Sequence, residues 1–257
     1  MKVERAGGVV TVTLNKPDIR NAMDEELTER FAQTMLELRH DTEVRAVVIT
    51  GAGSAFCAGG DLSWIQPGPD ASVPEMRRKM RIFYRKFLAV RDLEVPTIAA
   101  INGPAVGAGM CVALACDIRL AAEGSFLSAP FTKLGMHPGM AASYLLTRLV
   151  GGARAAELFY TARKVDAEEA ASIGLVNRVV PADSLMDEAR AMAETIAANA
   201  PIAMTMTKRA VQLAERLDLE AMLEIEGLAQ PITMATNDMT EGVTAAREKR
   251  APKFQNR

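Results

Sequence analysis

Short apolar runs alternate with amphipathic segments along most of the chain. Residues 9–14 (VVTVTL) and 45–50 (RAVVIT) are rich in β-branched side chains and predict strands. Between them, apolar residues recur at helical spacing from Asp24 to about His40 and predict a helix. The alternation of strand, turn and helix then continues and predicts an α/β fold. The remaining predicted strands are 95–101, 117–122 and 175–180, and the remaining predicted helices are 76–92, 108–115, 140–150, 153–160 and 166–172, with a loop over 62–75.

The pattern changes near residue 185, beyond which almost every segment is typical of a helix. Pro201 and Pro231 predict breaks in this part, because proline cannot donate the backbone hydrogen bond that a helix interior needs. At 257 residues the chain can form one large domain with an appendage. We therefore predict an α/β core over residues 1–195 and a C-terminal helical region over residues 196–257.

Composition argues against several classes of partner. The formal net charge of −2 gives no reason to expect nucleic acid or a membrane surface. The apolar run over 97–122 is interrupted by Asn102 and Pro104, so it predicts a buried loop, helix and strand rather than a membrane span. Three cysteines without CxxC spacing favour reduced thiols over a disulfide framework or a metal site. Because the N-terminal residues also lack the apolar core of a signal peptide, we expect a cytoplasmic protein.

Two glycine-rich turns carry the strongest chemical signal. Residues 55–62 (AFCAGGDL) and 101–122 (INGPAVGAGMCVALACDIRLAA) each place glycines between apolar runs. Glycine lets backbone N–H groups approach a ligand without interference from a side chain. Two such turns can direct two N–H donors at one oxygen atom, which is the arrangement of an oxyanion hole. Ala108 would be the first residue of the predicted helix over 108–115, and the unpaired N–H groups and the dipole at a helix N-terminus favour negative charge.

Together these segments resemble the enoyl-CoA hydratase/isomerase family, the crotonase superfamily, over nearly the whole chain. Besides the two turns, the matching segments are NKPDIRNAM (15–23), KLGMHPG (133–139) and EGVTAAREKRAPKF (241–254). The resemblance implies a crotonase-like spiral core of repeated β-β-α units and a helical C-terminal region that takes part in trimerisation. It also implies an acyl-CoA thioester as ligand, with coenzyme A as part of the substrate and no separate cofactor, in a homotrimer or hexamer.

The resemblance also implies roles for particular residues. The oxyanion-hole donors would be the backbone N–H groups of Cys57 and Ala108. Phe254 would approach coenzyme A from a neighbouring subunit or from the chain's own tail. The turns that contact coenzyme A would include Arg20, Ala22, Ala58, Gly59 and Gly60.

The sequence departs from the family pattern where family hydratases carry their two catalytic glutamates, because these positions hold Cys111 and Phe131. Each positioned acid or base contributes a factor of about 10²–10⁴, so ordinary hydration of a 2-enoyl-CoA is expected to be very slow. His137 could be a replacement acid or base near neutral pH, or a structural histidine that contacts a loop carbonyl. Cys111 could be a nucleophile with a lowered pKa at the helix N-terminus, or a small buried apolar residue.

Three functions are compatible with these residues. The first is acyl-CoA chemistry of the hydratase/isomerase type that uses a non-standard acid–base group such as His137. The second is enolate chemistry with fewer carboxylates, such as decarboxylation of a malonyl-type thioester, which needs no base to remove a proton. The third is an acyl-CoA-binding protein without catalysis. Asp61 and Asp117 are interpreted as structural partners of backbone N–H groups, and the basic helix over 76–92 as a solvated face, with contact to coenzyme A phosphates as the alternative.

Overall fold

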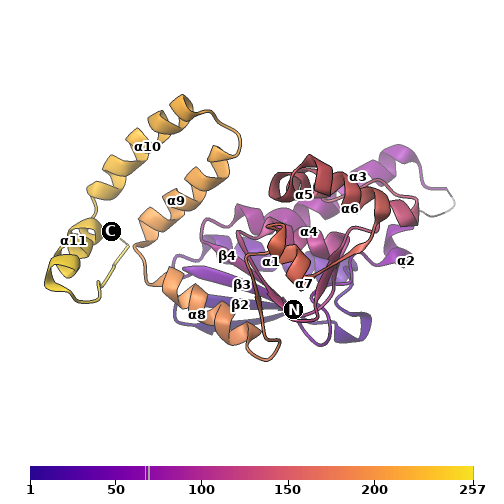
Figure 1. Ribbon diagram of the computed structural model, residues 1–257, viewed down its shortest axis with the longest axis horizontal. Coiled ribbons are helices and arrows are strands. Elements are labelled where there is room, and N and C mark those ends of the chain that lie inside the picture. Colours follow the sequence, from indigo (N-terminus) through magenta and orange to yellow (C-terminus); the bar gives the residue numbers. More distant parts are fainter. Residues whose placement is uncertain (67, 69, 257) are drawn as a thin grey trace.

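The computed structural model describes residues 1–66, 68 and 70–256, and a six-stranded sheet forms the centre of this described part (Figure 1). The strands of the protein are β1 (Lys2–Ala6), β2 (Val9–Leu14), β3 (Ala46–Gly51), β4 (Thr97–Ile101), β5 (Ala105–Val106), β6 (Ile118–Ala122), β7 (Phe126–Ser128), β8 (Lys164–Asp166) and β9 (Arg178–Val180). The central sheet has the order β1-β2-β3-β4-β6-β9. β1 is antiparallel to β2, and the other neighbours are parallel. A smaller sheet has the order β5-β7-β8.

Helices cover both faces of the central sheet. They are α1 (Glu25–His40), α2 (Leu62–Ile65), α3 (Val73–Leu88), α4 (Ala108–Ala115), α5 (Ala142–Val150), α6 (Gly152–Thr161), α7 (Ala167–Ser172), α8 (Leu185–Ala197), α9 (Pro201–Ala214), α10 (Leu219–Met234) and α11 (Asn237–Glu248). Single 3-10 turns occupy Pro17–Ile19, Ala89–Asp92 and Thr132–Leu134. Within the described part of the chain, no helix combines the length and the apolar character needed to cross a membrane.

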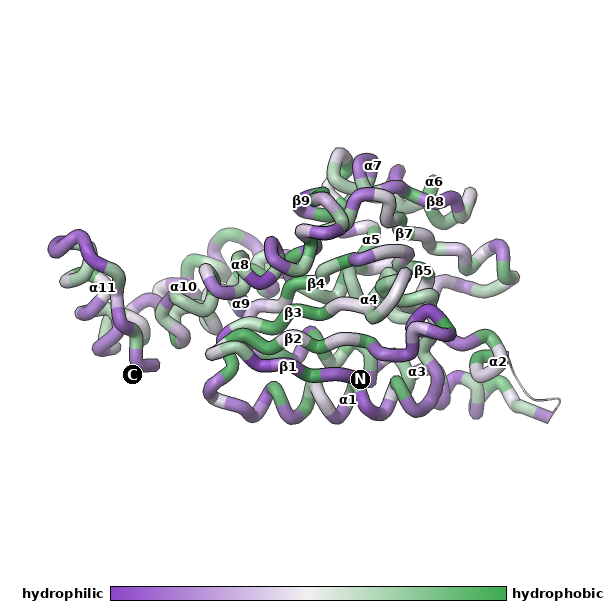
Figure 2. The backbone as a smooth tube through the Cα atoms, turned by 90° about the horizontal axis from the view of Figure 1, so that it is seen from below, coloured by the Kyte–Doolittle hydropathy of each residue, from purple (hydrophilic) through white to green (hydrophobic). Residues whose placement is uncertain are grey.

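Alternation along the strands divides the core into two layers. In β2, Val9 packs in the cluster that contains α8, whereas Val10 and Val12 pack in the larger cluster that contains α1, α3 and α4. β3 repeats the pattern, with Val48 on the α8 side and Val47 on the other. Side chains of a strand alternate between faces, so a sheet covered on both sides produces continuous apolar runs. Figure 2 shows β2, β3 and β4 as largely hydrophobic segments in the middle of the molecule.

The C-terminal helices α9, α10 and α11 extend away from the sheet, and the C-terminus lies beside α11 (Figure 1). A polar link joins α9 to the core. The buried Lys208 on α9 forms an ion pair of 2.8 Å with Asp117 and donates to the carbonyl oxygen of Val95 at 2.8 Å. Asp117 also accepts hydrogen bonds from the N–H and the hydroxyl of Thr97. The interpretation of Asp117 as a structural partner of backbone N–H groups is therefore confirmed, and α9 is anchored to the start of β4.

Most predicted elements lie where the pattern placed them, and the differences have local causes. β1 gives no clear signal, because all of its residues are exposed. The loop expected over 62–75 contains α2 and the start of α3, which follows a capping box between Ser72 and Glu75. The break expected at Pro231 is wrong, because Pro231 lies inside α10. Gly227, four residues earlier, is exposed, so water can bond the carbonyl group that proline leaves without a donor.

Candidate active site

The two glycine-rich turns lie against each other beyond the C-terminal ends of β3 and β4. The N–H of Cys57 donates to the carbonyl oxygen of Pro104 at 3.1 Å, and the N–H of Val106 donates to the carbonyl oxygen of Cys57 at 3.0 Å. These bonds form an isolated parallel bridge between Cys57 and Ala105. Two segments that are far apart in the sequence are therefore held in a fixed register.

A third turn, residues 15–23, completes this cluster. Asn21 is fully buried with a φ of 57°, and its side-chain amide donates to three carbonyl groups within residues 52–56. The N–H of Ala58 donates to the carbonyl oxygen of Arg20 at 2.9 Å. The three turns thus form one hydrogen-bonded unit, which explains how distant segments present their amides at one place.

Two glycines allow this close approach. Gly59 has a φ of +103°, and a Cβ on it would lie 2.8 Å from the carbonyl oxygen of Val106 and 3.7 Å from the nitrogen of Ala108. A Cβ on Gly109 would lie 2.3 Å from the carbonyl oxygen of Cys57. Because the opposing atoms belong to the backbone, a larger residue at either position would push the two turns apart.

The amides of the first turn differ in their availability to a ligand. The N–H of Cys57, predicted to be an oxyanion donor, is buried and already occupied in the bridge, so that prediction is wrong. The N–H groups of Ala58 and Asp61 are also paired within the cluster. Among the described residues, the N–H groups of Gly59 and Gly60 have no acceptor, and Gly60 is partly exposed whereas Gly59 is buried. The available donor of the first turn is therefore that of Gly60.

Ala108 supplies an available donor on the second turn. It is the first residue of α4, and the N-cap Gly107 has a φ of 53° and makes no side-chain capping bond. The first bond of the helix runs from the N–H of Cys111 to the carbonyl oxygen of Gly107 at 3.1 Å. In the described structure the N–H of Ala108 consequently has no acceptor, and it lies at the positive end of the helix dipole.

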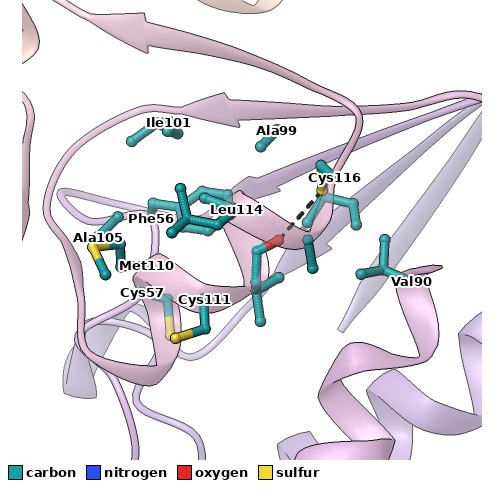
Figure 3. Packing of buried hydrophobic residues seen from close by; sticks show 14 of the residues in the cluster. Phe56, Cys57, Val90, Ala99, Ile101, Ala105, Met110, Cys111, Leu114 and Cys116 are labelled. Carbon is teal, nitrogen blue, oxygen red and sulfur yellow. Dashed lines mark hydrogen bonds between the residues drawn. The ribbon is translucent and has the colours of Figure 1, made fainter. Parts of the chain in front are cut away.

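The thiols of Cys57 and Cys111 belong to the core beside α4 (Figure 3). Burial raises the pKa of each thiol to about 12. The suggestion of a lowered pKa for Cys111 is therefore wrong, because loss of hydration outweighs the effect of the helix N-terminus. The Sγ atom of Cys111 lies 3.8 Å from the carbonyl oxygen of Gly139. These properties fit a small buried apolar residue and not a nucleophile.

Phe131 is the second of the two residues that the resemblance puts at the glutamate positions of family hydratases. Its side chain is partly buried and packs against the main core. The ring lies beside the second turn, since its Cζ atom would be 3.9 Å from a Cβ on Gly107. Cys111 and Phe131 therefore present a thiol and an aromatic ring next to the N-terminus of α4, and neither side chain can ionise near pH 7.

His137 is exposed, and its Nδ1 atom lies 2.8 Å from the carbonyl oxygen of Pro138. Because a carbonyl oxygen only accepts, this contact places a proton on Nδ1 and leaves Nε2 for any acid–base role. The contact is the one expected for a structural histidine, and the acid–base role stays a prediction.

Tyr84 enters the site from α3, although the sequence pattern did not draw attention to it. It is half-buried, and its Oη atom would lie 2.6 Å from a Cβ on Gly139. Burial, with a smaller effect of the Cys111 thiol, raises the pKa of Tyr84. The helical period could have found it, because Tyr84 lies between the buried Phe83 and Phe87 on the inward side of α3.

The residues predicted to contact coenzyme A lie on the turn cluster. Arg20 is exposed with a φ of 53°, and Ala22 and Ala58 are partly exposed beside it. Phe254 lies elsewhere, because its ring would be 3.5 Å from a Cβ on Gly242 in α11. Figure 1 shows the C-terminus on the far side of α9 from α3 and α5. The chain's own tail therefore does not reach this site.

Other polar residues near the site have structural partners or face solvent. Asp61 is the N-cap of α2 and accepts hydrogen bonds from the N–H groups of Ser63 and Trp64, which confirms its interpretation as a capping residue. On α3, four arginines line a shallow surface groove and form no ion pair in the described part of the chain. They are Arg77, Arg78, Arg81 and Arg85.

Comparison with known proteins identifies the family. A family model described as enoyl-CoA hydratase/isomerase matches residues 4–257. The short-chain-enoyl-CoA hydratase of Clostridium acetobutylicum is 36% identical over 257 residues, which cover 99% of this chain and 97% of that protein. The 1,2-epoxyphenylacetyl-CoA isomerase of Escherichia coli is 34% identical over 248 residues, covering 96% of this chain and 95% of that protein.

A crystal structure of an enoyl-CoA hydratase from Bacillus anthracis superposes with a TM-score of 0.94 at 36% identity, covering 100% of this chain and 99% of that one. The mixed α/β core and the helical C-terminal region are thus those of the crotonase fold. The chain belongs to the enoyl-CoA hydratase/isomerase family.

Proposed function

We propose that this protein stabilises the enolate of an acyl-CoA thioester between the backbone N–H groups of Gly60 and Ala108. The observation that carries the proposal is that both amides lack acceptors in the described structure while the Cys57–Ala105 bridge holds their turns together. A donor that is fixed before the reaction typically contributes about 3–4 kcal/mol to a transition state that develops negative charge on oxygen. Membership of the family supports an acyl-CoA thioester as substrate.

The groups beside the amides favour enolate chemistry over ordinary hydration. A thiol whose pKa is raised to about 12 stays neutral near pH 7, and a phenyl ring carries no proton to exchange, so Cys111 and Phe131 cannot activate water. The hydratase/isomerase alternative requires His137 to turn Nε2 towards the bound acyl group. We therefore propose a reaction that depends mainly on stabilising charge at the thioester oxygen.

Binding of [1-¹³C]butyryl-CoA tests the proposed function directly. Two donors at one carbonyl oxygen polarise the C=O bond, so we expect saturable binding and a downfield shift of the carbonyl ¹³C resonance. The measurement is NMR of the labelled thioester during titration with the protein. Absence of binding, or binding with the resonance of the free ligand, would contradict the oxyanion hole, and the second result would favour a binder without catalysis.

We also propose how coenzyme A is held. The exposed Arg20 can donate hydrogen bonds to phosphate oxygens, and Ala58 to Gly60 present backbone beside it. Phe254 belongs to this proposal only as a residue of a neighbouring subunit, because it lies far from the site of its own chain. We propose a cytoplasmic location, because all three cysteines are free thiols in the structure and reduced thiols are typical of that compartment.

The C-terminal region supports assembly into a homotrimer or hexamer. Large apolar side chains are exposed along α9, α10 and α11, where water would be excluded by a second copy of the chain. They are Val211, Leu219, Leu223, Leu228, Ile232, Met234, Met239 and Val243.

Light scattering after size exclusion is expected to give three or six times the chain mass of 27.7 kDa. Leu228 is 71% exposed in the single chain, and the proposed assembly would bury it. Leu228→Asp should lower the measured mass, because the assembly would then have to bury a carboxylate. Leu134→Asp, at an exposed leucine outside this region, is the matched control and should leave the mass unchanged. A monomeric wild-type protein would contradict the proposed assembly.

A further inference from the structure

We propose that the Tyr84 hydroxyl donates the proton to the α-carbon of the thioester enolate, and that the substrate is a 2-carboxyacyl-CoA. This inference rests on the proposed oxyanion hole formed by Gly60 and Ala108. It adds a proton donor and a substrate class to that site.

The fold brings the hydroxyl of Tyr84 to the correct side of α4. Tyr84 packs on Phe83 with ring centroids 6.1 Å apart, and its Oη atom lies against Gly139 in the segment before α5. The carbonyl group of Gly139 in turn contacts the Sγ atom of Cys111 at 3.8 Å. Cys111 follows Ala108 by three residues, so the two lie about 5–6 Å apart on one side of the helix. A chain of contacts through Gly139 and Cys111 thus links the hydroxyl to the first turn of α4, which begins with the amide of Ala108.

The hydroxyl is also free to act on a ligand. It makes no hydrogen bond to any described residue, although Tyr84 is half-buried. In the described structure, the one side-chain polar atom that is both fully buried and without a partner is Ser125 Oγ. The Tyr84 hydroxyl also has no partner, so it is not fully buried. The hydroxyl can therefore meet a bound ligand, and its proton is not committed to another described residue.

The surroundings keep this phenol protonated. Burial of the phenol, and to a smaller extent the Cys111 thiol, raises the pKa of Tyr84. No carboxylate or cation of the described structure contributes to this shift. A neutral phenol can give a proton to a carbanion but is a poor base near pH 7. Cys111 and Phe131 supply no base either, and the exposed His137 has its Nδ1 atom on the carbonyl oxygen of Pro138. These residues favour an enolate that forms without removal of an α-proton.

Loss of carbon dioxide from a 2-carboxyacyl-CoA meets this requirement. The bond between C2 and the carboxylate breaks, its electron pair enters the enolate, and carbon dioxide leaves. The O–H bond of Tyr84 then breaks as its proton moves to C2, and the phenolate regains a proton from water. The net reaction consumes one proton from solvent, and the amides of Gly60 and Ala108 hold the enolate oxygen between the two steps.

The test compares Tyr84→Phe with Tyr160→Phe, which removes the hydroxyl of a residue that is 80% exposed. The probe is methylmalonyl-CoA in D₂O, and NMR reports carbon dioxide release and deuterium at C2 of the propionyl-CoA formed. The wild-type protein and Tyr160→Phe are expected to deliver deuterium to one face of C2. Tyr84→Phe is expected to lower kcat by about 100-fold and to give deuterium on both faces, because water then protonates the enolate.

Butyryl-CoA binding separates failure of this inference from failure of the proposed function. The inference holds if Tyr84→Phe loses rate and stereoselectivity but retains the wild-type carbonyl shift of bound butyryl-CoA. It is overturned if Tyr84→Phe keeps both rate and stereoselectivity. It is also overturned if the wild-type protein polarises bound butyryl-CoA but releases no carbon dioxide from methylmalonyl-CoA. A wild-type protein that binds no butyryl-CoA overturns the proposed function itself.

Discussion

Replacement of Ala108 by proline is expected to lower kcat by about 10²–10³-fold, because proline removes the N–H of the proposed oxyanion hole. Ala108 is the first residue of α4, a position at which helices accept proline, so the fold should persist. The measurements are kcat with a thioester that the wild-type protein turns over and the ¹³C shift of bound [1-¹³C]butyryl-CoA. The shift should return towards that of the free thioester in proportion to the lost hydrogen bond.

Ala108→Val is the matched control for this experiment. Valine adds similar bulk at the buried position but keeps the N–H, so the carbonyl shift should stay close to that of the wild-type protein. Equal losses in both variants would show that bulk alone disturbs the site and would remove Ala108 from the oxyanion hole. Full activity of a folded Ala108→Pro protein would do the same.

Replacement of Gly109 by alanine is expected to affect both stability and activity. Its Cβ would lie 2.3 Å from the carbonyl oxygen of Cys57, so α4 must move away from the first turn. Overpacking of this kind lowers the free energy of unfolding by about 1–3 kcal/mol. A displacement of about 1 Å between reacting groups can cost about 100-fold in rate. Urea unfolding and kcat measured on the same preparation give the two effects.

Gly227→Ala provides the control for the loss of a glycine. Gly227 lies in α10, and no described atom outside the local backbone of that helix lies within 4 Å of the added Cβ. Alanine should therefore raise the free energy of unfolding by about 0.5–1 kcal/mol and leave kcat unchanged. If Gly109→Ala behaved like this control, the two turns would not need to be in close contact, and the geometry of the proposed oxyanion hole would be incorrect.

The sequence predicts the fold well because its signals are local. β2, α1, β3 and α4 each have a period or a glycine turn that can be read within a short window, and the apolar strands follow from a sheet covered on both faces. β1 escapes prediction because it is an exposed edge strand. The error at Pro231 has another cause, because helix continuation there depends on an exposed Gly227 and not on proline alone.

The site is less predictable because it depends on pairing between distant segments. The turn at residues 55–62 contains several amides, and the sequence cannot show that the bridge to Ala105 consumes that of Cys57 and leaves that of Gly60 free. The pKa of the Cys111 thiol likewise depends on burial beneath neighbouring elements. Tyr84 reaches the site only through the packing of α3 beside α4, which no motif encodes.

All three cysteines are buried, so the rate at which their thiols are alkylated reports local or global unfolding. A thiolate that is exposed to solvent attacks the carbon of iodoacetamide and displaces iodide, so these thiols react only after part of the chain unfolds. Cys57 lies in the first turn, whereas Cys116 follows the last turn of α4. The order in which these two thiols are labelled therefore records whether the turn cluster opens alone or together with the whole core.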